Sequence, residues 1–116
     1  MKTLLLLNDA PYGSERTYNG LRLAASLARS ERASVRVFLI GDGAAAARKG
    51  QKVPQGYYNV EVMLGAVSRH GGEIGVCSSC MDARGLRDED LVAGARRSSM
   101  EELTRWTLEA DKTLVF

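Results

Sequence analysis

The chain has 116 residues with a formal net charge of +2, and 45% of its residues are hydrophobic and 26% charged. This length suffices for one domain with its own core, and the composition is that of an ordinary globular protein. The scattered Lys and Arg residues lack the basic stripe of a nucleic-acid-binding protein, and no apolar run approaches the roughly 20 residues of a membrane-spanning helix. We therefore expect a single domain over residues 1–116 that binds neither nucleic acid nor membrane.

The first part of the chain alternates between strand-like and helical patterns. Thr3–Leu7 is a continuous apolar run that closes at the turn Asn8–Gly13, which predicts a buried strand. Ser14 is a suitable N-cap, so we expect a helix from there to about Arg29, with apolar residues every three or four positions. Ala33–Ile40 is a second β-rich run.

The middle of the chain predicts a loop, a long helix and a third strand. Ala44–Lys49 is compatible with one or two helical turns, and Gly50–Gly56 has the composition of an exposed, mobile loop. Tyr57–His70 predicts a helix that stops at Gly71-Gly72, and Glu73–Cys77 follows as a strand. The apolar face expected of this helix is formed by Val60, Met63, Leu64 and Val67.

The last part of the chain predicts two more strands around a capped helix. Asp88–Val92 resembles a short helix that ends by Gly94, and a short strand is expected around Ala95-Arg96. Ser99 to Glu102 is a capping box that opens a helix, and Lys112–Phe116 is the last strand. One side of that helix is expected to carry Leu103, Trp106, Thr107 and Ala110.

Alternating strands and helices, with strands that are apolar on both faces, are typical of a parallel sheet covered by helices on each side. Right-handed crossovers bring the carboxyl ends of all strands to one edge, where ligands bind in such folds. Three loops should meet there: Asn8–Ser14, Gly41–Gly43 and Cys77–Gly85.

Cys77 and Cys80 are the only cysteines, and they lie where the third strand gives way to a helix-compatible segment. The positive end of a helix dipole favours the thiolate, which is the form that attacks sulfur or binds metal. The apolar run Leu4–Leu7 is too short for a secretory signal, so we expect a cytoplasmic protein. In a reducing compartment, two cysteines at this spacing indicate catalysis, redox chemistry or metal binding.

Three segments resemble the DsrE/DsrF-type sulfur-relay family, which includes TusD-like and YchN-like branches. These segments are Ala10-Pro11-Tyr12-Gly13 after the first strand, the loop from Cys77 to Arg84-Gly85, and the end of the chain from Glu109 to Phe116. The resemblance covers nearly the whole chain, and it implies one DsrE-like domain.

The resemblance implies a flavodoxin-like three-layer α/β/α sandwich with a five-stranded, mostly parallel sheet, assembled as a homotrimer or hexamer. It places the sulfur-accepting position at Cys77, which would carry sulfane sulfur as a persulfide. It also implies protein partners that donate and accept sulfur, with no organic cofactor. Cys80 departs from the TusD-like pattern and resembles the YchN-like loop Cys-x-x-Cys-Met/Leu-Asp-Ala-Arg-Gly.

Each cysteine also has a plainer interpretation. Cys77 is either a nucleophile or a small buried apolar residue at a strand end. Cys80 either resolves a persulfide or sulfenate on Cys77 by forming a disulfide, or packs in the first helical turn. A zinc site is disfavoured, because structural zinc sites take four Cys or His ligands and the one histidine, His70, ends a different helix.

The neighbouring loops supply the remaining candidate site residues. Asn8, Tyr12, Gly13 and Ser14 lead into a helix N-terminus and would shape the pocket, with Tyr12 covering the thiol loop. Asp82 and Arg84 would orient the cysteine loop or steer an anionic persulfide donor, and a solvated ion pair is the alternative.

The sequence thus predicts a sulfur-relay protein, with sulfurtransferase as the candidate activity, that uses Cys77 with help from Cys80. The alternative is a non-catalytic oligomeric scaffold or small-ligand-binding module whose cysteines are at most redox-sensitive. A metal shared between subunits is a third hypothesis.

Overall fold

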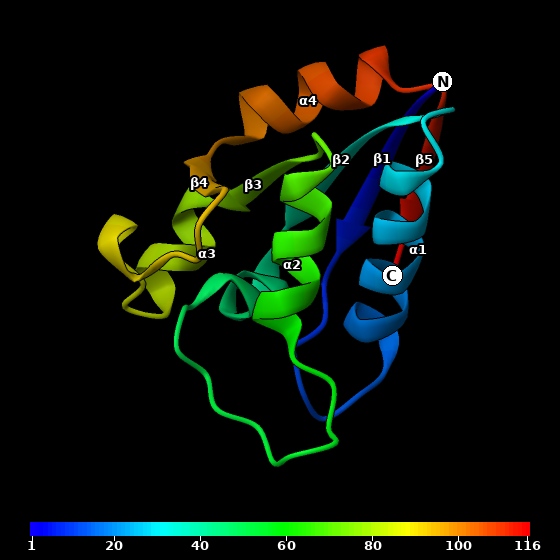
Figure 1. Ribbon diagram of the computed structural model, residues 1–116. Helices are drawn as coiled ribbons and strands as arrows, with labels where there is room; N and C mark the ends of the chain where they lie inside the picture. Colours follow the sequence, from blue (N-terminus) through cyan, green and yellow to red (C-terminus); the bar gives the residue numbers. More distant parts are fainter.

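The computed structural model describes all 116 residues, and its centre is a five-stranded sheet with the order β4-β3-β2-β1-β5 (Figure 1). All neighbouring strands are parallel. The strands are β1 (Lys2–Leu7), β2 (Ser34–Leu39), β3 (Glu73–Cys77), β4 (Ala95–Ser98) and β5 (Lys112–Val115). The predicted α/β fold with a five-stranded parallel sheet is therefore confirmed.

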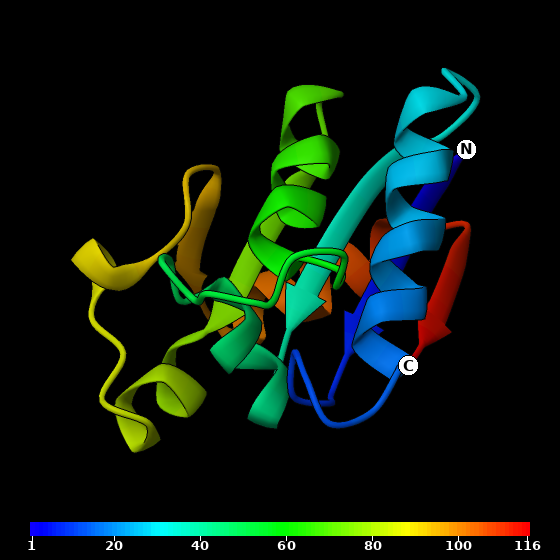
Figure 2. The same ribbon diagram turned by 60° about the horizontal axis from the view of Figure 1, so that its bottom comes forward.

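The helices lie on both faces of the sheet. Helices α1 (Arg16–Arg29) and α2 (Val60–Arg69) cover one face, while α4 (Met100–Glu109) alone crosses the other, as Figure 2 shows. The chain moves steadily in one direction from β1 to β4 and then returns past β3, β2 and β1 to reach β5. Because crossovers are right-handed, reversing the direction places α4 on the opposite face. This order has β5 beside β1 at the edge, whereas flavodoxin itself has the order 2-1-3-4-5.

The sheet separates two hydrophobic cores of unequal size. The larger core contains 20 buried residues beneath α1 and α2, and the smaller one contains Leu4, Phe38, Leu103 and Trp106 beneath α4. Phe38 meets the Trp106 ring edge-on, at an interplanar angle of 90°. A single helix cannot cover five strands, so Leu6 and Ile40 remain partly exposed and Val115 is 63% exposed.

Helices α1 and α2 begin later than their sequence patterns predict. Helix α1 starts at Arg16 with Glu15 at the cap position, and Ser14 accepts a hydrogen bond from the Arg16 N–H without being the N-cap. Helix α2 starts at Val60, because the Asn59 side chain accepts the N–H of Val62 and caps the helix there. Tyr57 and Tyr58 therefore lie in the preceding loop.

The capping box predicted for α4 is only half formed. Ser99 Oγ accepts the Glu102 N–H at 3.2 Å, as predicted. The Glu102 carboxylate does not return to the cap, because it bonds instead with Arg96, Ser98 and Arg105. Thr107, expected on the packed side of this helix, is exposed.

The short elements differ from prediction mainly in extent. The segment after β2 is a 3-10 helix, η1 (Gly41–Ala47), and the helix predicted over Asp88–Val92 is the single turn η2 (Asp88–Asp90). The loop from Gly50 to Gly56 is largely exposed, as expected. None of the helices combines the length and apolar character that crossing a bilayer would require.

Candidate dithiol site

Two sulfur atoms meet at the carboxyl edge of the sheet. Cys77 is the last residue of β3, and Cys80 lies one turn further along the short helix α3 (Ser78–Ala83). Both thiols are free and partly exposed, and Cys80 donates to Cys77 across a Sγ–Sγ distance of 2.6 Å. A strand that runs directly into a helix turns the two side chains toward each other, which explains the contact.

The surroundings of Cys77 favour its thiolate. Burial raises the pKa of the Cys77 thiol, but hydrogen bonds outweigh burial, so the net pKa lies below its usual value. The donors are the Cys80 thiol, the Ser79 hydroxyl and the backbone N–H groups of both residues. Ser79 Oγ lies 3.4 Å from Cys77 Sγ. A thiolate at neutral pH is the reactive form of cysteine.

The surroundings of Cys80 favour its protonated thiol instead. Burial and its hydrogen bond to Cys77 raise the pKa of the Cys80 thiol, and the Gly41 N–H and the Arg84 charge offset only part of that rise. The Gly41 N–H donates to Cys80 Sγ at 3.1 Å. The pair is therefore unequal: Cys80 holds the proton, and Cys77 accepts a hydrogen bond from it.

Element η1 brings the second loop to the sulfurs. Gly41 has a φ of +58°, in the left-handed region that favours glycine, and this turn aims its N–H at Cys80. Gly43 donates its N–H to the Asn8 carbonyl at 3.0 Å and leaves no room for a side chain, since a Cβ there would lie 2.2 Å from the Leu7 carbonyl oxygen. The Gly41–Gly43 loop therefore meets the cysteine loop, and of the Asn8–Ser14 loop only Asn8 bonds to η1.

Asp82 and Arg84 both take part in ion pairs that hold the cysteine loop. Arg84 donates to Asp42 at 2.7 Å and to the Cys80 carbonyl at 3.1 Å, which links α3 to η1. Asp82 accepts from Arg97 at 3.1 Å, and Arg97 also donates to Ser78 Oγ at 2.7 Å. Both are also largely solvated ion pairs, since Asp42 and Asp82 are 69% and 70% exposed, so the orienting role of Asp82 and Arg84 stays a prediction.

A small cavity of about 270 Å³ opens beside Cys77 on the face of the sheet that α4 covers. Besides the cysteine loop, it is lined by Phe38 of β2 and by Ser99 and Met100 at the start of α4. Sequence reasoning missed these three residues. The signal for Ser99 was available, because β4 pairs with β3 and its end lies beside Cys77, with Ser98 opposite that residue.

The predicted pocket loop is only partly at this site. Asn8 reaches it through its carbonyl, while its side chain donates to the Phe116 carbonyl at 3.2 Å. Ser14 donates to Asp9, and Gly13 is exposed in a left-handed turn with φ +108°. The hydrogen bonds of these residues go to their own loop, to η1 and to the end of β5.

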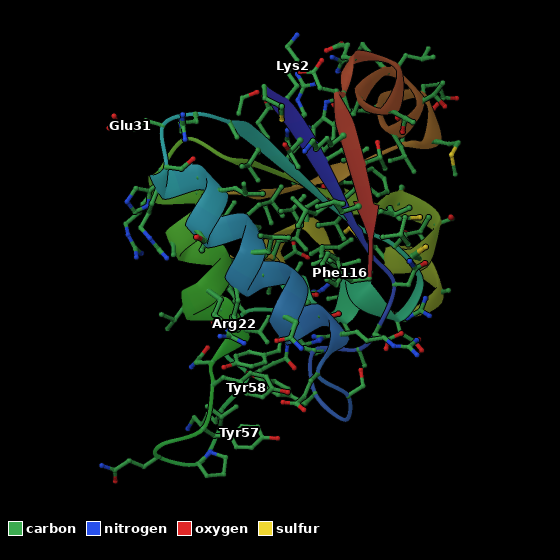
Figure 3. The ribbon with its side chains drawn as sticks, turned by 90° about the vertical axis from the view of Figure 1, so that its right-hand side faces the viewer. Lys2, Arg22, Glu31, Tyr57, Tyr58 and Phe116 are labelled. Atoms are coloured by element: carbon green, nitrogen blue, oxygen red, sulfur yellow. The ribbon has the colours of Figure 1, made fainter.

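Tyr12 does not cover the thiol loop, contrary to prediction. Its ring stacks on Tyr58 at 5.3 Å between centroids, and its hydroxyl accepts the Val60 N–H at 3.0 Å. Tyr57 and Tyr58 stack on each other at 4.7 Å, and Figure 3 shows them near Arg22 of α1. Tyr12 therefore lies beside α2 and not beside α3, because it stacks on Tyr58 and accepts the N–H of Val60, which has no partner within the helix.

His70 lies far from the sulfurs along the sheet. It follows α2 and precedes the start of β3, whereas Cys77 is at the other end of that strand. Its Nδ1 lies 2.8 Å from the Ala66 carbonyl oxygen. No group of three or more His, Cys, Asp or Glu side chains gathers as a set of metal ligands.

The family model described as the DsrE/DsrF-like family matches this chain over residues 1–116. Protein YchN of Escherichia coli is 39% identical over 116 residues, which are 99% of this chain and 98% of that protein. An uncharacterised protein of Methanocaldococcus jannaschii is 35% identical over 116 residues and covers 100% of each chain.

Solved structures show the same fold. The crystal structure of the E. coli YchN protein matches with a TM-score of 0.93 at 39% identity, over 99% of this chain and 98% of that one. A protein of unknown function from Methanobacterium thermoautotrophicum matches with a TM-score of 0.79 at 14% identity, with 99% and 98% coverage, which supports the fold alone.

Proposed function

Because this chain belongs to the DsrE/DsrF-like family over its whole length, we propose that it is a sulfur-relay protein in which Cys77 carries sulfane sulfur as a persulfide. The observation that supports this proposal most directly is the state of Cys77. Its thiol has a lowered pKa, is partly exposed and opens into a cavity. A sulfur carrier needs these three properties.

The loading step is a displacement at sulfur. The Cys77 thiolate attacks the outer sulfur of a persulfide on a donor protein, a bond forms between Cys77 Sγ and that sulfur, and the donor's S–S bond breaks. The donor cysteine leaves as a thiolate, so no oxidant or reductant is consumed. An acceptor protein then takes the outer sulfur by the same kind of attack.

The cavity beside Cys77 suits this exchange. Its volume of about 270 Å³ is just below the roughly 300 Å³ at which small-molecule sites begin. It has room for the end of a persulfide side chain presented by a partner protein. Ser79 and Ser99 supply hydroxyl groups at its wall, and Phe38 and Met100 supply apolar surface that suits polarisable sulfur.

Intact-mass measurement tests the proposal. The reduced Cys80→Ser protein is incubated with glutathione persulfide under anaerobic conditions, and we expect the mass of one sulfur atom to be added. The matched Cys77→Ser protein, which keeps Cys80, should gain none. Failure of Cys80→Ser to take up sulfur, with circular dichroism showing a native fold, would contradict the proposal.

A redox-sensitive scaffold is the second candidate function, and the closeness of the two sulfurs favours it. Thiols 2.6 Å apart need no backbone movement to form a disulfide. Under this alternative the pair oxidises and reduces without taking up sulfur, so Cys80→Ser would show no sulfur adduct while the wild-type protein still formed an internal disulfide.

A further inference from the structure

We propose that Cys80 gives the sulfur loaded on Cys77 a second exit, by attacking Cys77 Sγ and releasing the sulfur as hydrosulfide, which leaves a Cys77–Cys80 disulfide. This step depends on the proposed loading of Cys77 and adds a reductive activity to it. The substrate class is then a persulfide, the product is sulfide, and the electrons come from the dithiol of this chain.

The two sulfurs are arranged for such an attack. Cys80 packs against the larger core on the α1 and α2 side, whereas Cys77 packs against the smaller core and lines the cavity. Cys80 itself does not line that cavity. A sulfur added to Cys77 would therefore extend into the cavity while Cys80 contacts Cys77 Sγ from the other side. Displacement at sulfur requires this geometry, because the entering electron pair must oppose the breaking S–S bond.

Cys80 is held for this role by groups that do not contact the cavity. The Gly41 N–H donates to Cys80 Sγ at 3.1 Å, and Arg84 donates to the Cys80 carbonyl at 3.1 Å while it is paired with Asp42. In the unloaded protein the Cys80 thiol donates a hydrogen bond to Cys77 Sγ. Once Cys77 carries sulfur, its Sγ is bonded to a second sulfur and is a weaker hydrogen-bond acceptor, so it holds the Cys80 proton less strongly. The Gly41 N–H still stabilises a thiolate at Cys80.

The step balances without an outside oxidant or reductant. The bond between Cys77 Sγ and the outer sulfur breaks, and its electron pair leaves with the outer sulfur. A bond forms between Cys80 Sγ and Cys77 Sγ, and the Cys80 proton ends on the departing sulfur as hydrosulfide. The outer sulfur is reduced and the two cysteines are oxidised to a disulfide. A dithiol reductant such as dithiothreitol then restores the pair by thiol–disulfide exchange.

An internal thiol in contact with its target has a large kinetic advantage over an acceptor that arrives by diffusion. The wild-type protein should therefore release its sulfur as sulfide when no acceptor is docked at the cavity. Removing the Cys80 thiol should convert the protein into a stable persulfide carrier.

The test compares the wild-type, Cys80→Ser and Cys77→Ser proteins, reduced and desalted under anaerobic conditions and given one equivalent of glutathione persulfide. For the wild type we expect one sulfide per chain above the Cys77→Ser background and a final mass lower by two hydrogen atoms. For Cys80→Ser we expect one added sulfur and no sulfide above background. Cys80→Ala should behave like Cys80→Ser, which guards against an effect of the serine hydroxyl.

The outcomes separate the two proposals. Stable retention of the added sulfur by the wild-type protein, or a disulfide formed without sulfide, would overturn the second exit and leave the carrier function standing. No uptake of sulfur by a folded Cys80→Ser protein would overturn the carrier function itself. With excess glutathione persulfide and dithiothreitol, the wild type should release sulfide repeatedly and faster than Cys80→Ser, and a rate equal to that of Cys80→Ser would also overturn the second exit.

Discussion

At Cys77, the balance between burial and hydrogen bonding determines the charge of the sulfur. Burial alone would raise the pKa of both thiols and make them poor nucleophiles. Four hydrogen-bond donors reverse this effect at Cys77, whereas the single backbone donor at Cys80 does not. The lowered pKa suits Cys77 to attack first, and the raised pKa suits Cys80 to follow.

Replacing Cys80 by alanine should raise the pKa of Cys77, because the Cys80 thiol is the first of the hydrogen-bond donors that lower it. The rate of Cys77 alkylation by iodoacetamide follows the thiolate fraction, so its pH profile should move to higher pH. Each unit of pKa rise reduces the rate about tenfold at pH values well below the pKa.

Ser79→Ala provides the comparison for this measurement. It removes the next donor, so its alkylation profile should move in the same direction by a smaller amount. Alkylation profiles of Cys80→Ala and the wild type that coincide would show that the Cys80 thiol does not stabilise the Cys77 anion.

At the scale of elements, contacts between α4 and β4 hold the residues that line the Cys77 cavity. Glu102 of α4 bonds with Arg96 and Ser98 of β4 and with Arg105 of its own helix. Hydrogen bonding to Arg96 lowers the pKa of Glu102, and its burial offsets only part of this effect. This cluster fixes the start of α4, and hence Ser99 and Met100 at the wall of the cavity.

Glu102→Gln should reduce the free energy of unfolding at neutral pH by about 1–2 kcal/mol, since a charge-assisted network is lost at a side chain only 17% exposed. The folded pKa of Glu102 is below its unfolded value of about 4.3. Its stabilisation is therefore complete above the unfolded pKa and disappears as pH falls through the folded one. Urea unfolding from pH 7 to pH 3, values chosen around that pKa, measures this effect.

Glu101→Gln is the matched control for this loss, because Glu101 is exposed in the same helical turn and joins none of these bonds. Wild type and Glu102→Gln should converge in stability toward acid pH, and Glu101→Gln should follow the wild type throughout. If the free energies of unfolding of wild type and Glu102→Gln differ by the same amount at all pH values, the ionised network is not the cause of the difference.

Two helical glycines should respond in opposite ways to alanine. In α1, a Cβ at Gly20 would lie 2.5 Å from Leu7 Cδ2 and 3.2 Å from the Phe116 ring, so Gly20→Ala should destabilise by about 1–3 kcal/mol through overpacking. In α2, a Cβ at Gly65 meets only the flexible end of Arg69, at 3.2 Å, so Gly65→Ala should stabilise by about 0.5–1 kcal/mol. Chemical denaturation gives both changes in the free energy of unfolding. A stabilising Gly20→Ala would contradict the close packing of α1 on β1, and a destabilising Gly65→Ala would contradict the open surroundings of Gly65 in α2.

At the scale of the whole molecule, the sequence predicts the architecture better than it predicts the site. The apolar runs of β1, β2 and β3 clearly predict strands because these strands are buried on both faces. The capping pattern that begins at Ser99 predicts the start of α4. Strand alternation also predicts which loops converge. The direction of an individual side chain depends on neighbours that are distant in sequence. The sequence therefore wrongly predicts that Tyr12 covers the thiols, whereas Tyr12 contacts Tyr58 and Val60. The cavity walls contributed by Phe38 and Met100 likewise depend on packing that no local pattern encodes.

The open part of the sheet on the α4 face has a further consequence for assembly. Val115 of β5 lies in register with Leu6 of β1 and is 63% exposed, while Leu6 and Ile40 pack against the α4 core but remain partly exposed on the same face. We propose that a second copy of this chain covers this apolar stripe in a homo-oligomer, a trimer or hexamer. Burying the stripe would remove apolar surface from water.

Val115→Glu should dissociate this oligomer, because an unpaired carboxylate in an apolar interface costs several kcal/mol. Val62→Glu is a matched control: Val62 is 61% exposed against 63% for Val115, but it lies on α2, over the opposite face. Light scattering after size-exclusion chromatography should give a multiple of the chain mass for the wild type and Val62→Glu, and the mass of one chain for Val115→Glu. A monomeric wild type would refute the assembly, and dissociation by Val62→Glu alone would move the interface to the α1 and α2 face.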